Sequence, residues 1–170
     1  MMKRASMAQI PLEALDLQVQ NPGFTLWLRI GGLSSVLPFR ISRLLEIIGE
    51  GHMLEDVDDE QYWDQVREFS WVPAGHSLVK VALTPKSIPA LEAYLEGKPI
   101  LRRYAAGGQA AWIALDDSPR LLDPELNDRG LSGLVIWGPP GFPRLGELRG
   151  TSFLRRVKVS LDPAFRFTEV

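Results

Sequence analysis

The chain contains no cysteine among its 170 residues. This absence excludes disulfide bonds, thiol nucleophiles and zinc sites built from thiolates, and it makes the cytoplasm the expected compartment. Only two histidines occur, His52 and His76, and neither lies at metal-ligand spacing from another potential ligand. No apolar run approaches the roughly 18 residues of a membrane helix, and the start of the chain lacks the apolar core of a signal peptide.

The usual signatures of nucleotide binding and hydrolysis are also missing. The sequence has no P-loop, no Gly-x-Gly-x-x-Gly fingerprint and no Gly-x-Ser-x-Gly elbow. The paired glycines at 31–32 and 107–108 are too short to cradle a phosphate and indicate turns instead. The acidic residues between 56 and 60 lack the spaced ligands and central glycine of a calcium loop. The sequence therefore identifies no catalytic residue and predicts no metal site.

Composition and charge are those of an ordinary globular domain, with 45% hydrophobic and 24% charged residues. The formal net charge of −2 gives no reason to expect nucleic acid as a partner. Charge is uneven along the chain: residues 50–68 carry eight acids against one arginine, and residues 144–170 carry six bases against three acids. Either segment is a docking surface or simply a solvated face.

Two strand–helix units predict an α+β fold. Apolar residues alternate from Phe24 to Ile30, which indicates a strand with one buried face. A helix follows, capped by Ser35 and running to residue 48. The same order recurs as a strand over 78–83 and a short helix over 88–95. We expect a mostly antiparallel sheet with helices packed on it.

Other segments give weaker patterns. Asp58 and Gln61 form a capping box for a further helix, on which Trp63 and Arg67 are spaced for a cation–π contact. We predict a polar loop with one helical turn over 116–129, a buried strand over 134–137, and a last strand or extended tail over 153–159. Residues 1–22 show no clear period, so they form a leader or irregular segment before a single α+β domain over 23–170.

The run from Leu101 to Asp117 predicts the central hairpin, with Gly107-Gly108 as its turn. Ala111, Ile113 and Leu115 share one face, so Trp112 lies on the other, between small alanines. Tyr104 precedes the turn. Such a surface could receive a flat ligand or a second domain. In the alternative interpretation, Trp112 is covered by a helix of the same chain.

The order of these elements resembles the carboxyl-terminal half of the FAD-binding subunit of bacterial glycolate oxidase, within the FAD-linked oxidase family. The similar stretches are FTLWLRIGGLSSVLPFRISRLLEIIG, EDVDDEQYWDQVREF, SLVKVALTPKSIPALEAYL, YAAGGQAAWIAL and FLRRVKVSLDPAFRF. The positions that match the family pattern are Gly32, Trp63 with Arg67, Gly107-Gly108 with Trp112, and Asp162-Pro163 with Phe167. The resemblance covers most of residues 24–168.

This resemblance implies a ferredoxin-like substrate or cap domain that lies over the flavin of an FAD held by another domain or partner chain. A 2-hydroxy acid such as glycolate would be oxidised between the two, with the flavin supplying the hydride chemistry. On this reading Tyr104, Gln109 and Trp112 face the flavin ring, and Arg67 holds the substrate carboxylate. The chain alone is not expected to be active.

Two departures from the family pattern accompany the resemblance. The family's amino-terminal FAD-binding domain, with its Gly-rich loop, is absent from these residues. The tail also ends on Phe167-Thr168-Glu169-Val170, where relatives continue with an Asn-Pro-Gly-Arg-like sequence. The alternative function, from a different class, is a non-catalytic α+β module that binds a protein or a small ligand, with Tyr104 and Trp112 in its core.

Overall fold

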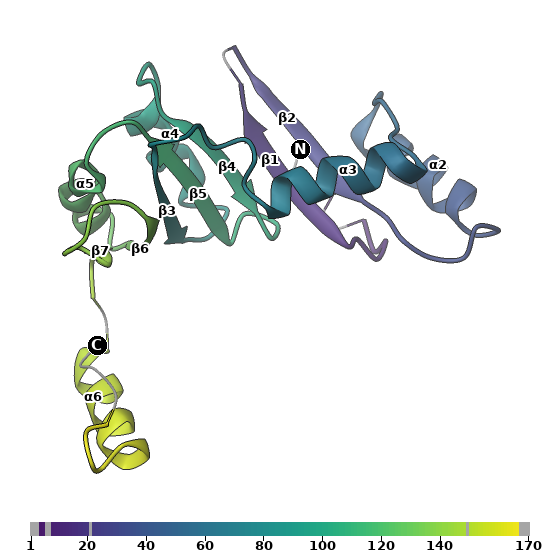
Figure 1. Ribbon diagram of the computed structural model, residues 1–170. Helices are drawn as coiled ribbons and strands as arrows, with labels where there is room; N and C mark the ends of the chain where they lie inside the picture. The colour runs from purple at the N-terminus through teal and green to yellow at the C-terminus, as the bar shows by residue number, and fades with distance from the viewer. Residues whose placement is uncertain (1–3, 6–7, 21, 149, 167–170) are drawn as a thin grey trace.

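The computed structural model describes residues 4–5, 8–20, 22–148 and 150–166, which form a seven-stranded antiparallel sheet and five α-helices (Figure 1). The strands are β1 (Ala14–Val19), β2 (Phe24–Arg29), β3 (Ser77–Ala82), β4 (Leu101–Ala105), β5 (Ala110–Leu115), β6 (Ser132–Trp137) and β7 (Arg144–Gly146). The helices are α2 (Leu37–Ile48), α3 (Asp56–Arg67), α4 (Ile88–Leu95), α5 (Asp123–Asp128) and α6 (Thr151–Leu161), with the short 3-10 helix η1 (Pro119–Leu122) before α5.

The strands lie in the order β2-β1-β4-β5-β3-β6-β7, and every neighbouring pair is antiparallel. The chain leaves β3, crosses through α4 to β4, and then returns along β5, which fills the space between β3 and β4. A second crossing through η1 and α5 brings β6 to the other side of β3. The β1–β2 hairpin extends the sheet beyond β4.

One face of the sheet carries the hydrophobic core, and helices α4 and α5 cover it. Ile88, Leu91 and Leu95 of α4 are buried against this face, because their spacing places them on one side of the helix. Along each strand, successive side chains point to opposite faces of the sheet, so every second side chain joins this core. The core also contains Val79, Val81, Tyr104, Ala111, Ile113, Leu115, Leu122, Leu126 and Leu145.

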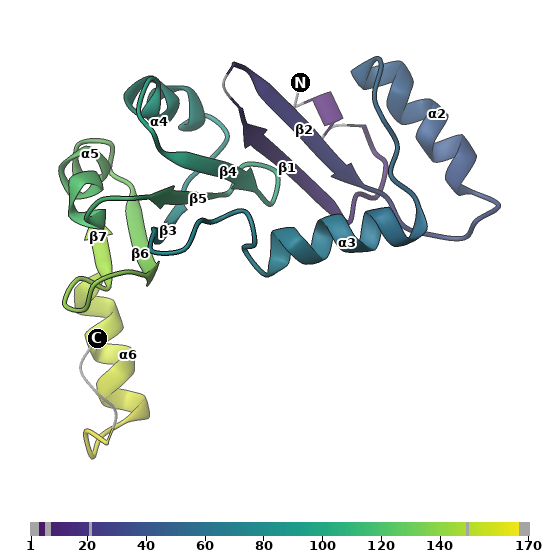
Figure 2. The same cartoon turned by 45° about the horizontal axis from the view of Figure 1, so that its top comes forward.

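The opposite face carries α3, which lies across β1 and β2 (Figures 1 and 2). No residue of α3 is fully buried. It is attached instead by specific contacts: Tyr62 stacks on Trp27 with ring centroids 3.9 Å apart, and Asp59 accepts hydrogen bonds from Arg29. The two faces of one sheet are therefore held in different ways, one by apolar burial and the other by aromatic and charged contacts.

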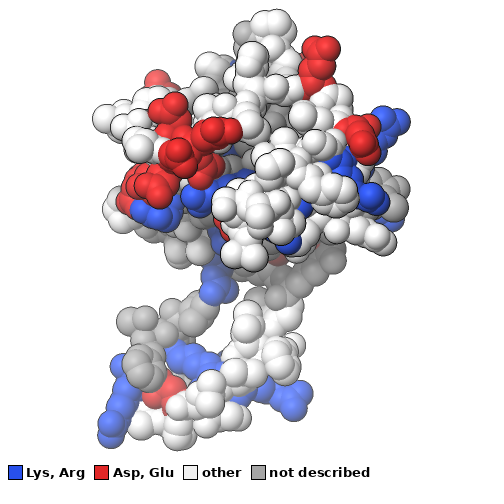
Figure 3. Space-filling model, turned by 90° about the vertical axis from the view of Figure 1, so that its right-hand side faces the viewer, with Lys and Arg blue, Asp and Glu red and all other residues white. Residues whose placement is uncertain are grey.

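The chain exposes more surface than its size predicts. Its accessible surface is 11563 Å², whereas a compact monomer of 19.0 kDa is expected to expose about 8,400 Å². Part of the excess comes from α6, which projects away from the sheet and has no fully buried residue (Figures 1 and 2). Acidic side chains gather on the α3 end of the molecule, whereas the charged side chains of the projecting part are mostly basic (Figure 3).

Much of the predicted secondary structure is confirmed. The strand over 24–30, the helix over 37–48, the strand over 78–83, the short helix over 88–95 and the hairpin about Gly107-Gly108 all occur at the expected places. The polar segment 116–129 holds one turn of 3-10 helix and then α5. The α+β class and the antiparallel sheet are confirmed with them.

Four local predictions are wrong, besides the predicted cap of α2, whose N-cap residue is Val36 rather than Ser35. Residues 153–159 belong to helix α6 rather than to a strand, because Phe153, Val157 and Leu161 also repeat every fourth residue. Residues 14–19 form β1, although no period was assigned to this segment. Strand β6 is not buried: Leu134 and Trp137 remain 45% and 42% exposed.

The fourth correction concerns α3, which begins at Asp56, two residues before the predicted capping box. Its N-cap residue is Glu55, whose side chain makes no capping hydrogen bond.

Within the described part of the chain, no helix combines the length and the apolar character needed to cross a membrane.

Candidate functional site

A row of mostly polar side chains, with Trp112 and Leu134 among them, crosses the sheet on the face that carries α3, which we call the aromatic face. The strand pairing aligns these residues from one edge of the sheet to the other. In order they are Thr25, Gln18, Arg103, Trp112, Lys80, Leu134 and Arg144. Trp27 and Trp137 extend from the same face in neighbouring rows. Because side chains alternate along a strand, this face shares no side chain with the apolar core.

Trp112, at the centre of the row, is half-buried beneath a residue of the same chain. The ring of Phe69, just after α3, lies 4.6 Å from the ring of Trp112 and 5.4 Å from that of Trp137. The ammonium of Lys80 lies 5.2 Å from the centre of the Trp112 ring. The small alanines beside Trp112 therefore leave room that Phe69 and Lys80 fill.

Phe69 occupies a costly backbone conformation. Its φ of 55° lies in the left-handed region, where a bulky residue is unfavourable. The backbone turn there is fixed by hydrogen bonds that Phe69 and Ser70 donate to the carbonyls of Val66 and Gln65. The strained residue is thus the one that follows the end of α3 and places its ring against Trp112 of the sheet.

A buried polar network lies next to Trp112. Arg103 donates from Nε to Asp16 at 2.8 Å and from Nη1 to the hydroxyl of Tyr62 at 3.0 Å. Arg103 and Asp16 are only 3% and 5% exposed. The Nη2 atom of Arg103 is buried without a hydrogen-bond partner among the described residues. The network joins β4, β1 and α3, which are distant in sequence.

Tyr62 completes this network as a neutral hydroxyl. Burial raises the pKa of Tyr62 to about 12, and the hydrogen bond from Arg103 opposes that rise without cancelling it. The indole of Trp27, beneath the Tyr62 ring, donates to the side-chain oxygen of Gln18 at 3.0 Å. We conclude that α3 is attached to the sheet through a chain of specific polar and stacked contacts.

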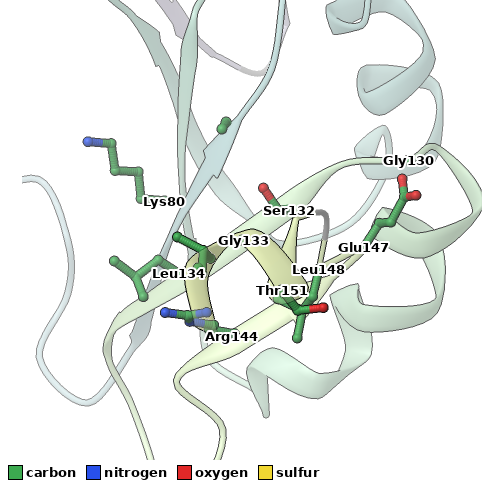
Figure 4. Close-up of a pocket in the computed structure, with 11 residues that line it drawn as sticks. Lys80, Gly130, Ser132, Gly133, Leu134, Arg144, Glu147, Leu148 and Thr151 are labelled. Atoms are coloured by element: carbon green, nitrogen blue, oxygen red, sulfur yellow. The ribbon is translucent and has the colours of Figure 1, made fainter. Parts of the chain in front are cut away.

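A groove of about 380 Å³ opens farther along the aromatic face, between β3, β6, β7 and the start of α6 (Figure 4). Lys80 and Arg144 line it together with the hydroxyls of Ser132 and Thr151. Apolar lining comes from Leu134, Leu148 and Leu154. The groove thus combines two cations, two hydroxyls and an apolar surface.

The residues predicted to face a flavin do not share one surface. Tyr104 pairs with Ala111, so it points into the core, where its hydroxyl hydrogen-bonds to Glu92. Burial and that hydrogen bond both raise its pKa. Gln109 is exposed in the hairpin turn, and Trp112 lies on the aromatic face. The expectation that Tyr104 and Trp112 form a common surface is wrong, since they occupy opposite sides of the sheet.

Arg67, predicted to hold a carboxylate, is exposed at the end of α3. Its guanidinium forms ion pairs with Asp64 and Glu68, at 3.1 Å in each case. The cation that the structure places over Trp63 is Arg103, 5.7 Å from the ring, so the predicted Trp63–Arg67 contact is wrong. Arg67 does not line the groove.

Sequence reasoning did not find Arg103, Lys80 or Arg144. A signal was present for Arg103 and Lys80, because each is a charged residue within a strand and lies on the same face as Trp112. Arg144 gave no such signal, since the short strand β7 was not predicted. Phe167, one of the positions that match the family pattern, lies outside the described residues.

The described residues do not gather three His, Cys, Asp or Glu side chains into a possible metal site. Comparison with known proteins gives the chain no relative: no family model, no curated protein and no solved structure matches it.

Proposed function

We propose that this chain is the substrate, or cap, domain or subunit of an FAD-dependent oxidoreductase that oxidises a 2-hydroxy acid such as glycolate. A separate FAD-binding domain or partner chain holds the cofactor, in the cytoplasm. When bound there, FAD would supply the hydride chemistry, and the present chain binds and orients the acid. The observation that carries the proposal is the uncovered part of the aromatic face, where a groove with two cations lies beside Trp112.

The strand order supports the fold that the resemblance implies. The sequence β3-α4-β4-β5-α5-β6, with the spatial order β4-β5-β3-β6, has the connectivity of a ferredoxin-like β-α-β-β-α-β unit. In that arrangement both helices cover one face of the sheet and leave the other available to a partner. The excess accessible surface and the projecting α6 also favour a domain that is completed by a second one.

The residues present fit only part of an FAD site. The chain has no Gly-rich loop that could hold the pyrophosphate. The Trp112 ring is also contacted by Phe69 and Lys80 of the same chain, so a flavin could reach only the part of the ring that stays exposed. Gln109 and Trp112 stay predicted flavin neighbours, whereas Tyr104 is buried in the core and cannot contact a flavin directly. For this reason we assign FAD binding to the other domain.

The covered state of Trp112 also supports the second candidate function, a non-catalytic module that binds a protein or a small ligand. On that view Phe69, Trp112 and Trp137 are a minor structural core under α3. The groove would then bind a ligand without any reaction. The two candidates differ in whether the chain associates with a flavoprotein.

The test is to express the tagged chain from its own genomic segment, with the neighbouring reading frames, and to purify whatever binds it. We expect a flavoprotein to co-purify, and its flavin absorbance to bleach when glycolate or lactate is added without oxygen. FAD added to the isolated chain should keep its free absorbance and fluorescence. Purification without a flavoprotein, or a bound flavin that no 2-hydroxy acid reduces, would favour the non-catalytic module.

A further inference from the structure

The groove on the aromatic face carries two cations that form no ion pair with a carboxylate of the described residues. Lys80 and Arg144 both line it, and neither forms an ion pair with a described residue. Arg144 is half-buried, in contrast to the exposed Arg155 and Arg156 of α6. A partly desolvated guanidinium without a counter-charge is a natural site for an anion.

Strand pairing brings the two cations to one place. Lys80 on β3 pairs with Leu134 on β6, and Leu134 pairs with Arg144 on β7. The backbones of β3 and β7 are therefore two strand spacings apart, about 10 Å. Both side chains are long enough to meet above Leu134 on a ligand of a few atoms. Figure 4 shows Lys80, Leu134 and Arg144 on the same side of the close-up.

Glu147, the acidic residue among the described lining residues, forms no ion pair with Lys80 or Arg144. Glu147 lies on the opposite side of the close-up, and its carboxylate is directed away from Arg144 (Figure 4). Lys80 lies over the Trp112 ring, at a distance that permits a cation–π contact of modest energy. An anion in the groove can draw the flexible ammonium from the ring without breaking an ion pair.

We propose that this groove binds the carboxylate of a small 2-hydroxy acid, with Arg144 and Lys80 as its ligands in place of Arg67. The guanidinium of Arg144 offers two parallel donors to the carboxylate, and Lys80 adds a second positive charge. The hydroxyls of Ser132 and Thr151 are available to the 2-hydroxyl group, and Leu134 contacts the short carbon chain. The choice of a 2-hydroxy acid rests on the proposed function, whereas the preference for an anion follows from the groove itself.

The isolated chain is sufficient for the test. The ¹⁵N-labelled protein is titrated with glycolate, lactate and inorganic phosphate at constant ionic strength, and backbone amide shifts are followed by NMR. We expect saturable shifts at residues of β3, β6 and β7 for the hydroxy acids. Lys80→Gln and Arg144→Gln should each weaken binding about tenfold, the usual effect of losing one charge-assisted hydrogen bond.

Matched controls are Lys86→Gln and Arg156→Gln, which remove exposed cations that do not line the groove. They should change the dissociation constant by less than about twofold. The proposal is overturned if the groove variants bind glycolate as tightly as the unaltered chain, or if no hydroxy acid binds. Equal or tighter binding of phosphate would also overturn it, since the groove would then be a general anion site.

This proposal and the proposed function can fail separately. If glycolate binds in the groove but the chain never associates with a flavoprotein, the proposed oxidase function is rejected and the proposed binding site is retained. If the chain forms an active flavoprotein complex but Lys80→Gln and Arg144→Gln leave KM for glycolate unchanged, the oxidase function is retained and the proposed binding site is rejected.

Discussion

Arg103 on β4 and Asp16 on β1 form an almost completely buried ion pair, 2.8 Å between Nε and Oδ2, across 87 residues of sequence. The strands that they join are paired through only two registered positions, Leu17 with Tyr104 and Gln18 with Arg103. The ion pair therefore reinforces the short pairing that connects the β1–β2 hairpin to the rest of the sheet. A lone charge at this position would be expensive, because water cannot reach it.

Asp16→Ala is expected to lower the free energy of unfolding by about 3–5 kcal/mol, because it leaves the Arg103 guanidinium buried without its counter-charge. Chemical denaturation followed by far-ultraviolet circular dichroism measures the change. The matched control is Asp59→Ala, which breaks the partly exposed pair with Arg29 and should cost about 1 kcal/mol or less. Equal costs for the two variants would mean that the Asp16 pair is not desolvated in solution.

Tyr62→Phe should destabilise the protein by about 1–3 kcal/mol at neutral pH, because Arg103 Nη1 loses its acceptor while the stack on Trp27 is kept. Tyr62→Ala should cost more, since the stack is lost as well. Equilibrium unfolding in urea gives both values. If the two substitutions cost the same, the ring contact contributes nothing.

The stability of the protein should fall as the pH rises from 10 to about 12. The pKa of Tyr62 is raised in the folded state from 10.0 to about 12, so in this range the unfolded chain releases a proton that the folded chain retains. The contribution is complete below pH 10 and is lost as the pH approaches 12. Denaturation midpoints across this range should decline less steeply in Tyr62→Phe. A parallel decline in both proteins would contradict the assignment.

Phe69→Ala should lower stability by about 2 kcal/mol, less than for a fully buried phenylalanine, because the ring is half-buried between Trp112 and Trp137. Hydrogen exchange should then accelerate in α3 and stay slow in α4, since only α3 depends on this contact. Phe153→Ala, on the exposed α6, is the control. Uniform acceleration in both helices would show that the two faces unfold together.

Substitutions on α6 should leave the isolated chain almost as stable as before. Phe153→Glu and Leu161→Glu replace side chains that are 64% and 80% exposed, so each is expected to change the unfolding free energy by less than about 0.5 kcal/mol. Leu91→Ala, in the core under α4, should cost about 2–5 kcal/mol in the same assay. A large cost for either α6 variant would mean that this helix packs on the body in solution.

The sequence predicts best those elements that local chemistry specifies. Helices α2 and α4 each have proline in the first turn, where its missing N–H costs little, and an apolar stripe behind it. The hairpin at Gly107-Gly108 follows from a turn with positive φ, which the two glycines adopt readily and which extends to Ala106. In contrast, the residues of α6 fit both a two-residue and a four-residue repeat, so their periodicity could not decide between strand and helix.

The site was harder to predict because it depends on register and long-range pairing. The turn already implies that Ala105 pairs with Ala110, which places Tyr104 opposite Ala111 and Arg103 opposite Trp112. That register predicts that Tyr104 lies on the face of Ala111, in the core, and not beside Trp112. The partnership of Arg103 with Asp16, and the convergence of Lys80 with Arg144, require the full order of the strands. No local pattern supplies that order.

The asymmetry of the two faces gives the protein an intrinsic optical reporter. Trp27, Trp112 and Trp137 lie on the aromatic face, Trp63 is on α3 beside Tyr62, and Trp71 is in the segment that joins α3 to β3. These are all five tryptophans of the chain, so its tryptophan emission reports on the attachment of α3, and the core beneath α4, whose aromatic residue is Tyr104, contributes none of it. A melting curve recorded by tryptophan emission therefore follows only one side of the sheet. Comparing it with circular dichroism would reveal whether α3 detaches before the core melts.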